Sequence, residues 1–213
     1  MIVLGIDPGT VAAGYGAVRA EGGRTRLVTC GAVRARRSQK LAERLRAIHD
    51  GLAAVVAETR PDVAVVEQPF AGENLATAIA IGEARGVALL ACAAAGVPVE
   101  EYSPAEIKRA VVGSGAARKD QVALMVKAVL GLAEPPTPSD AADALAAAIC
   151  YLHRAPVRTA ANKAGFTAEA QRRRAATLAD NDPREGRSPR LGASAVKKPG
   201  SGDLWKSSST GTT

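Results

Sequence analysis

Short apolar runs open the chain and predict strands. Residues 1–6 are almost continuously apolar and stop at Asp7-Pro8-Gly9, which predicts a buried strand that ends at a turn. Segments 15–20 and 25–34 are rich in Val and Thr, and Glu21-Gly22-Gly23 between them is a hairpin signal. We therefore expect three consecutive strands that pair as antiparallel neighbours.

The pattern then changes to helices and strands in alternation. Ser38 is a candidate N-cap for a helix that extends to about Thr59, with apolar residues three and four positions apart. Ser103 and Glu106 have the spacing of a capping box and predict another helix start. Further strands are expected over 63–66, ending on Glu67, and over 97–102, and further helices over 75–95, 119–132 and 140–154. This order predicts an α/β fold with a mixed β-sheet flanked by helices.

Segment 75–95 is apolar almost all round, with Glu83 and Arg85 as its only charges. If one side of such a helix packs on a sheet, apolar surface remains exposed on the other side. Two identical helices that meet across a two-fold axis bury that surface symmetrically. The segment therefore predicts a homodimer.

Charge divides the chain into two parts. The 213 residues include 28 Lys and Arg against 21 Asp and Glu, a net charge of +7. Residues 156–213 hold 11 of the basic and five of the acidic residues. Only about a tenth of them are Leu, Ile, Val or Phe, below the roughly 20% that a core requires. We expect 1–155 to form one domain and 156–213 to be a basic, largely disordered tail whose end is typical of a linker or of expression-vector sequence.

Cysteine usage and hydropathy indicate the compartment. Cys30, Cys92 and Cys150 lie far apart without a CxxC or Cys–His pairing, which argues against a disulfide framework and a zinc finger. The N-terminus lacks the basic and long apolar regions of a signal peptide. The longest uninterrupted apolar stretch, 87–97, is shorter than a bilayer requires. We expect a protein of the reducing cytoplasm with no membrane partner.

Four carboxylates fall where α/β folds assemble sites. Asp7 closes the first predicted strand and Glu67 the fourth, and strand ends at one sheet edge are common site positions. Asp140 and Asp143 stand three residues apart at the start of the last predicted helix, so they point the same way. Carboxylates gathered beside an apolar face repel one another unless they are protonated or bridged by cations. Oxygen ligands without His or Cys suit Mg²⁺ or Mn²⁺, and two such ions suit phosphoryl transfer.

Each acid also has a purely structural interpretation. Asp7 suits a turn before a Pro-Gly pair, and Glu67 suits an ion pair with an arginine. Asp140 suits a helix N-cap, a role equally open to Ser139, and Asp143 favours the helix dipole. The metal-site hypothesis is preferred because it explains all four positions together.

Four sequence blocks carry a resemblance to a known family. They are GIDPGT, VVEQPF, EYSPAEIKRAVVGSGAARKDQV and SDAADALAAAICYLH, in this order over essentially residues 1–155. GIDPGT alone is weakly specific, whereas the four blocks together are highly specific. Together they resemble the RuvC family of Holliday-junction resolvases, which are nucleases with a ribonuclease-H-like fold.

The resemblance implies a function and a site. It implies that the metal-binding catalytic acids are Asp7, Glu67, Asp140 and Asp143, with two Mg²⁺ ions per active site and Mn²⁺ as a substitute. It also implies a homodimeric enzyme that cuts opposed strands of a four-way DNA junction in recombination and repair. Such an enzyme leaves 5′-phosphate and 3′-hydroxyl ends and works with a branch-migration motor complex. Some family members have His where Asp140 stands. Nothing carries over to residues 156–213.

Basic and aromatic residues add candidates for contact with DNA. Lys119 follows GSGAAR, where the family places a lysine beside the scissile phosphate, whereas a merely solvated lysine is disfavoured by the dipole at a helix start. Lys108, Arg109 and Arg118 are candidates for backbone phosphates, although a solvated face explains Arg109 nearly as well. Phe70 could stack on or wedge into unpaired bases, as the family uses a residue in this position, and core packing is its alternative.

Two other function classes fit part of the pattern. An I-G-I-D-x-G-T strand and turn also cradles phosphates in sugar-kinase and actin-like ATPases, but that fold needs a second similar domain and an adenosine loop, for which 155 residues are too few. A non-catalytic junction-binding module on a decayed nuclease fold is expected to have lost at least one acid, and all four are present. A Mg²⁺-dependent structure-specific endonuclease is the favoured hypothesis.

Overall fold

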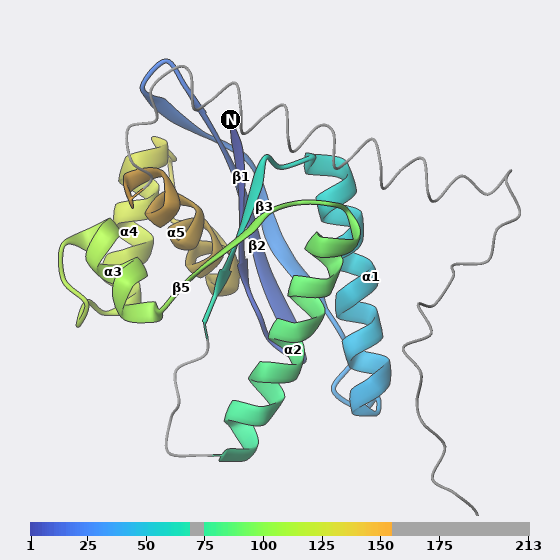
Figure 1. The fold of residues 1–213 in the computed structure, drawn as a ribbon. Coiled ribbons are helices and arrows are strands. Elements are labelled where there is room, and N and C mark those ends of the chain that lie inside the picture. The colour runs from blue at the N-terminus through green and yellow to red at the C-terminus, as the bar shows by residue number, and fades with distance from the viewer. Residues whose placement is uncertain (69–74, 155–213) are drawn as a thin grey trace, which may run out of the picture. The chain divides into compact units, whose positions relative to one another are not determined.

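The computed structural model describes residues 1–68 and 75–154, so the predictions for Phe70 and for the 156–213 tail lie outside the described residues. Its centre is one five-stranded sheet (Figure 1). The strands are β1 (Ile2–Asp7), β2 (Ala12–Glu21), β3 (Arg24–Arg34), β4 (Val63–Glu67) and β5 (Val99–Tyr102). The order is β3-β2-β1-β4-β5, in which β2 pairs antiparallel with both β1 and β3, and β4 and β5 run parallel to β1. The predicted mixed sheet is confirmed.

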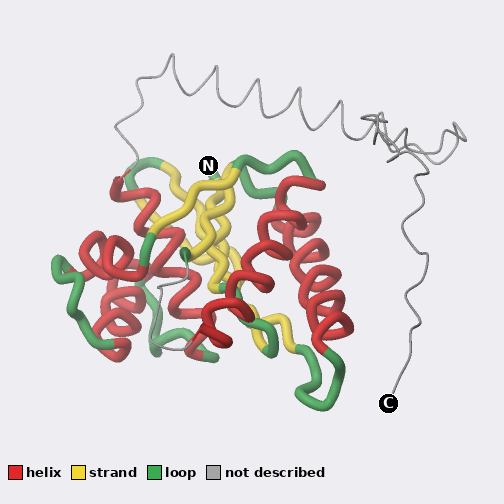
Figure 2. Tube along the Cα trace, turned by 60° about the horizontal axis from the view of Figure 1, so that its bottom comes forward, coloured by secondary structure: helices red, strands yellow, loops and turns green. Residues whose placement is uncertain are grey.

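Helices cover both faces of this sheet (Figures 1 and 2). One layer contains α1 and α2, and the other contains α5 with α3 and α4 packed beside it. Neighbouring strand residues alternate between the two layers, since Val3 packs in the α5 layer and Leu4 packs in the α1 layer. The helices are α1 (Leu41–Thr59), α2 (Leu75–Ala94), α3 (Pro104–Val112), α4 (Lys119–Leu130) and α5 (Ser139–Arg154).

Glycines allow α5 to lie unusually close to the sheet. A Cβ on Gly5 of β1 would lie 1.8 Å from the Ala144 carbonyl oxygen, and one on Gly14 of β2 would lie 2.0 Å from the Asp140 carbonyl oxygen. Both distances are far below any tolerable contact, so only glycine fits at these two positions. The strands and the helix backbone therefore touch directly, and this contact fixes where the first turn of α5 lies.

The start of α1 differs from the sequence-based expectation. Ser38 was expected to cap this helix, but the helix begins at Leu41 with Lys40 as its N-cap residue. The residues before it form a separate turn, in which the Gln39 amide donates to the Arg36 carbonyl and the Arg36 amide donates to the Gln39 side chain. The turn uses the positions that a helix starting at Ser38 would need, so the prediction for this helix start was wrong.

The length of α2 corrects a second expectation. In the part of the chain that the structure describes, α2 is the one helix long and apolar enough to cross a membrane, with a mean hydropathy of 1.6. The expectation rested on the uninterrupted apolar run 87–97 alone, whereas the helix has 20 residues and includes the charged Glu83 and Arg85. Ala84, Ala88 and Cys92 on one side of α2 are buried in the domain core, and the Arg85 guanidinium donates to both carboxylate oxygens of Glu101 at 2.6 and 2.7 Å. The helix is thus anchored in the domain by one side.

Replacing Gly5 with Ala tests the close packing of α5. The new Cβ meets helix backbone that cannot move without shifting α5, so we expect the free energy of unfolding to fall by about 1–3 kcal/mol or more. Leu124→Ala on α4 is the control, because Leu124 is 56% exposed and alanine is the most favourable residue for a helix. Urea denaturation of both variants measures the difference. Equal stabilities would contradict the proposed contact.

Candidate active site

The register of the sheet brings two acids to one edge. β1 and β4 run parallel with Ile6 opposite Val66, so Asp7 and Glu67, the next residue on each strand, end side by side. Both strands are buried along most of their length, which fixes the positions of the carboxylates at their ends. The predicted placement of these two acids at one sheet edge is confirmed.

The first turn of α5 adds the other two acids. Asp140 lies directly over Gly14, which is the partner of Asp7 in the pairing of β1 with β2. Asp143 follows one helical turn later and faces the cavity between the sheet and the helices. The close contact of α5 with glycine is therefore what places two helix carboxylates beside the strand-end pair.

A cavity of about 150 Å³ lies at this edge. Three of the four acids line it, namely Asp7, Glu67 and Asp143, whereas Asp140 does not line it and acts on Asp7 through its charge. Two predicted lysines, Lys108 from α3 and Lys119 from α4, complete its polar wall. Its apolar wall was not predicted from the sequence and comprises Pro104, Ile107, Val122 and Ala146.

The environment raises the pKa of both strand-end acids. Burial, followed by the charge of Asp143, raises the pKa of Asp7 to about 7, although Lys119 opposes the shift. Burial, followed by the charges of Asp7 and Asp143, raises the pKa of Glu67 to about 8, against Lys119 and Lys108. Both carboxyls therefore hold protons near neutral pH unless a cation relieves their mutual repulsion.

Lys119 is joined directly to the acid cluster. Its Nζ donates to the Asp143 Oδ2 at 2.7 Å, and this hydrogen bond holds the pKa of the lysine above its usual range. Lys119 is the first residue of α4, where the helix dipole alone would disfavour a cation. The carboxylates offset that unfavourable position, which supports the functional interpretation of this residue over a merely solvated one.

The other predicted DNA contacts are less clearly part of the cavity. Arg118 precedes α4 and donates two hydrogen bonds to the exposed Asp120, at 3.1 and 2.9 Å. Arg109 lies on α3, next to Lys108, but does not line the cavity. The structure thus places Lys108 and Lys119 in the site, and phosphate binding by Arg118 stays a prediction.

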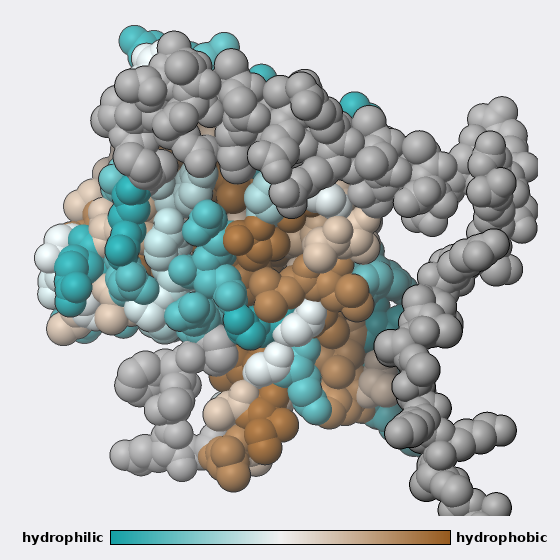
Figure 3. Space-filling view, viewed as in Figure 1, coloured by the Kyte–Doolittle hydropathy of each residue, from teal (hydrophilic) through white to brown (hydrophobic). Residues whose placement is uncertain are grey.

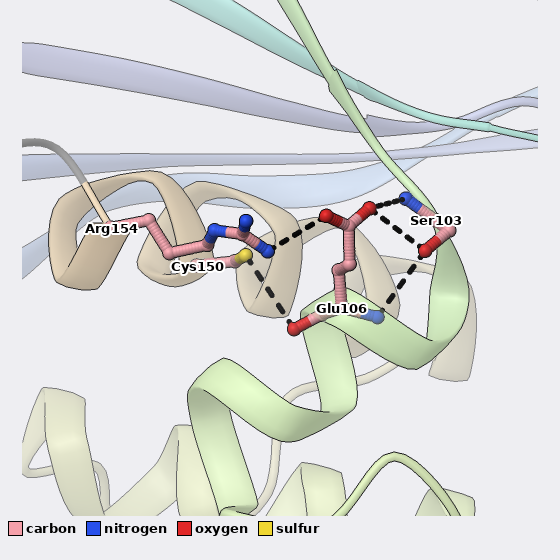
Figure 4. Close-up of polar contacts among 4 residues, drawn as sticks. All are labelled: Ser103, Glu106, Cys150 and Arg154. Atoms are coloured by element: carbon pink, nitrogen blue, oxygen red, sulfur yellow. Dashed lines mark hydrogen bonds and ion pairs between the residues drawn. The ribbon is translucent and has the colours of Figure 1, made fainter.

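Helix α3, which carries Lys108, is held by a clamp that sequence reasoning found only in part (Figure 4). The expected capping box is present, since the Ser103 amide and hydroxyl donate to the Glu106 carboxylate at 3.0 and 2.8 Å. The same carboxylate accepts from Arg154 at the end of α5, 48 residues away, at 2.9 Å. The Arg154 guanidinium also lies 5.1 Å from the centre of the Tyr102 ring. No local sequence signal marks this long-range pair.

The donor chemistry of the site suits a hard divalent cation. The candidate ligands are carboxylate oxygens, which Mg²⁺ and Mn²⁺ prefer, and a cation there would offset the burial and the repulsion that raise the pKa of Asp7 and Glu67. Within residues 1–68 and 75–154, no three His, Cys, Asp or Glu side chains form a preformed metal cluster. The Lys119 ammonium is instead paired with Asp143, at 2.7 Å. The residues therefore fit a divalent metal ion by their chemistry.

Comparison with known proteins gives consistent matches over the whole domain. Residues 3–151 match the family model described as crossover junction endodeoxyribonuclease RuvC. The protein of that name from Chloroflexus aggregans is 51% identical over 156 residues, which are 73% of this chain and 95% of the relative. The one from Halorhodospira halophila is 54% identical over 151 residues, 71% of this chain and 89% of the relative.

A solved structure agrees with these sequence relatives. It is described as Thermus thermophilus RuvC in complex with Holliday junction substrate, and it is 40% identical to this chain with a TM-score of 0.69. The match covers 73% of this chain and 94% of the Thermus chain, so the shared region is the domain that carries the acid cluster. This chain therefore belongs to the RuvC family of crossover junction endodeoxyribonucleases, which have a ribonuclease-H-like fold.

Proposed function

We propose that this protein is a structure-specific endonuclease that resolves Holliday junctions by paired nicks in opposed DNA strands. The observation that carries the proposal is the carboxylate cluster at the ends of β1 and β4, in a chain that belongs to a family of nucleases. The Thermus relative, 40% identical, was solved with a Holliday junction substrate. A non-catalytic junction-binding module is disfavoured, because such a module has no need for acids whose gathering raises the pKa of two of them.

The proposed cofactor is Mg²⁺, two ions per active site, with Mn²⁺ as a substitute. Asp7, Glu67 and Asp143, which line the cavity, would hold these ions, and Asp140 beside them would add a fourth carboxylate. When bound, the ions supply activation of water and stabilisation of the leaving oxygen in phosphodiester hydrolysis. The oxygen-only donor set and the raised pKa values of Asp7 and Glu67 support this assignment.

The chain itself supplies orientation and charge compensation. Buried strands hold the backbone of Asp7 and Glu67, so both carboxylates are kept at the cavity where a cation would bind. Lys119 holds a proton beside Asp143 and, when the acids are neutralised by metal, is free to turn toward the phosphate backbone. Lys108 also lines the cavity, from α3, and is suited to a neighbouring phosphate oxygen.

Amide substitutions of the acids test the catalytic assignment. Asp7→Asn and Glu67→Gln keep the side-chain shape but remove the charge that holds a divalent cation, so each is expected to lower the single-turnover cleavage rate of a junction by orders of magnitude. Asp143→Asn and Asp140→Asn are expected to lower the cleavage rate in the same way. Asp140→His is expected to retain activity with Mn²⁺, which accepts imidazole more readily than Mg²⁺ does. Asp50→Asn, on exposed α1 surface, is the control and should cut normally. Wild-type rates in Asp7→Asn would contradict the assignment.

The raised pKa values predict a pH effect on stability without metal. In EDTA the folded protein holds protons on Asp7 and Glu67 that the unfolded chain releases above the usual carboxyl pKa values of 3.8 and 4.5. Stability is therefore present in acid and is lost as the pH rises toward about 8. Asn has no carboxyl to ionise, so Asp7→Asn should lose less stability and be more stable than the wild type at pH 8. Each unit by which the pKa is raised corresponds to roughly 1.4 kcal/mol of free energy of unfolding.

Urea denaturation at pH 5, 6, 7 and 8 measures this effect, and Mg²⁺ should reverse it in the wild type. Asp50→Asn again serves as the control, because interaction with His49 lowers the pKa of that carboxyl and predicts no gain at high pH. A wild-type protein whose stability rises steadily from pH 5 to pH 8 in EDTA would contradict the burial of two protonated acids.

Paired nicks require two active sites, and the exposed side of α2 is proposed to join two copies of the chain. Leu75, Ile79 and Leu90 are 74%, 55% and 58% exposed. Their spacing of four and eleven residues places them on one side of the helix. Figure 3 shows apolar residues gathered over α2 on this face of the molecule. An apolar stripe of this kind is typical of an interface, and a symmetric contact buries it in both copies.

Charge substitution on this stripe tests the dimer. Ile79→Glu and Leu90→Glu place charge into the proposed contact, so each should shift the protein to monomers in sedimentation or light scattering. The matched control is Leu124→Glu on α4, because Leu124 is equally exposed at 56% and lies outside the stripe. An unchanged oligomeric state in both α2 variants would contradict the proposal.

The cellular setting of the activity is also proposed. Cys30, Cys92 and Cys150 are free thiols, which fits a reducing cytoplasm. The family resemblance adds a branch-migration motor complex as the partner that would present the junction. Neither proposal involves the cavity, so their failure would leave the catalytic assignment intact.

A further inference from the structure

The connection between β3 and α1 carries a dense group of cations, which we call the β3–α1 basic cluster. It contains one acid, Glu43, within residues 34–44. In the described part of the chain, none of its cations forms an ion pair, in contrast to Arg46, Arg85, Arg118, Lys119 and Arg154. The members of the cluster are Arg34, Arg36, Arg37, Lys40 and Arg44.

The backbone holds these cations in an ordered turn. The Ala35 amide donates to the Val11 carbonyl at 2.9 Å, and the Gln39 amide donates to the Arg36 carbonyl at 3.0 Å. Arg36 and Arg37 between these bonds are exposed. Arg44 has a buried Nε without a hydrogen-bond partner among the described residues. The cluster is therefore displayed by a fixed backbone, and its positive charge is uncompensated.

The cluster lies at the catalytic edge of the sheet. Arg34 pairs with Ala12 on β2, and Asp7 pairs with Gly14 on the same strand. The backbone of Arg34 is thus two strands across and two residues along from that of Asp7. At the usual spacings of about 4.8 Å between strands and about 3.4 Å per residue, their Cα atoms lie about 12 Å apart. Figures 1 and 2 show the start of α1 at the same end of the sheet as the end of β1.

We propose that the β3–α1 basic cluster binds the sugar-phosphate backbone of the junction arm that leaves the active site. This rests on the proposed function, since the arm is located by the scissile phosphate at Asp7. Phosphates of one strand advance 3.4 Å per base pair along a duplex, so about 12 Å corresponds to three or four base pairs from the cut. Exposed arginines without ion-pair partners suit phosphates better than a protein surface, which usually has an apolar centre.

The proposal separates two tasks at the edge of the sheet. The lysines of the cavity face the scissile phosphate, whereas the basic cluster holds the arm and sets its direction. Contacts of this kind are independent of base sequence and depend strongly on salt, because each releases bound counterions. The cluster therefore contributes affinity and register, and the cavity contributes the chemistry.

The test is the salt dependence of junction binding by the full-length protein without divalent metal. The variant Arg36→Gln/Arg37→Gln should lower the slope of log affinity against log salt by about two, since each lost phosphate contact accounts for about 0.9. The matched control is Arg24→Gln/Arg26→Gln, which removes the same charge from the β2–β3 hairpin at the opposite end of the sheet. The control should keep the wild-type slope.

Neutral methylphosphonate linkages locate the contact. Placed three or four base pairs from the cut, they should weaken binding by the wild type and have no further effect on Arg36→Gln/Arg37→Gln. Equal loss in both double variants would mean that only net charge matters and would overturn the proposal. An unchanged salt slope of junction binding in Arg36→Gln/Arg37→Gln would also overturn the proposal. An acidic protein surface would then be the occupant of the basic cluster. A wild type that neither binds nor cuts junctions would overturn the proposed function as well.

Discussion

Direct contact between the backbone of α5 and the sheet is the constraint on which the site depends. Any side chain at Gly5 or Gly14 would overlap a carbonyl oxygen of α5, so glycine at both positions brings the helix down onto β1 and β2. The first turn of α5 then lies over the residue that pairs with Asp7. The close packing of α5 on these glycines thus brings the two helix acids beside the two strand-end acids.

This cluster is unfavourable by itself, and the fold compensates for it locally. Burial and mutual repulsion raise the pKa of Asp7 and Glu67, so part of the stability of the domain is sacrificed for the site. Lys119 offsets some of this repulsion through its hydrogen bond to Asp143. Sites that remain strained without a cation are suited to bind one tightly, since binding relieves the repulsion that folding imposes.

The sequence predicted the parts of this arrangement that depend on local patterns. Strand ends located Asp7 and Glu67, and capping-box spacing located the start of α3. The start of α1 was misplaced because residues 36–39 form a turn of their own, and the Arg154–Glu106 pair was missed because its partners are 48 residues apart. The closeness of α5 to the sheet was also missed, since it depends on which residues face Gly5 and Gly14 across the fold.

A negative site that acts on a polyanion has to obtain its binding affinity elsewhere. When ionised, the acids at the edge repel the phosphate, and only Lys108 and Lys119 line the cavity as cations. Affinity must therefore come from cations outside the cavity that reach phosphates on either side of the cut. The ordered and unpaired cations between β3 and α1 meet this requirement, because they lie at the same sheet edge yet two strands away from the acids. Separating binding from chemistry in this way keeps the carboxylates available for metal ions.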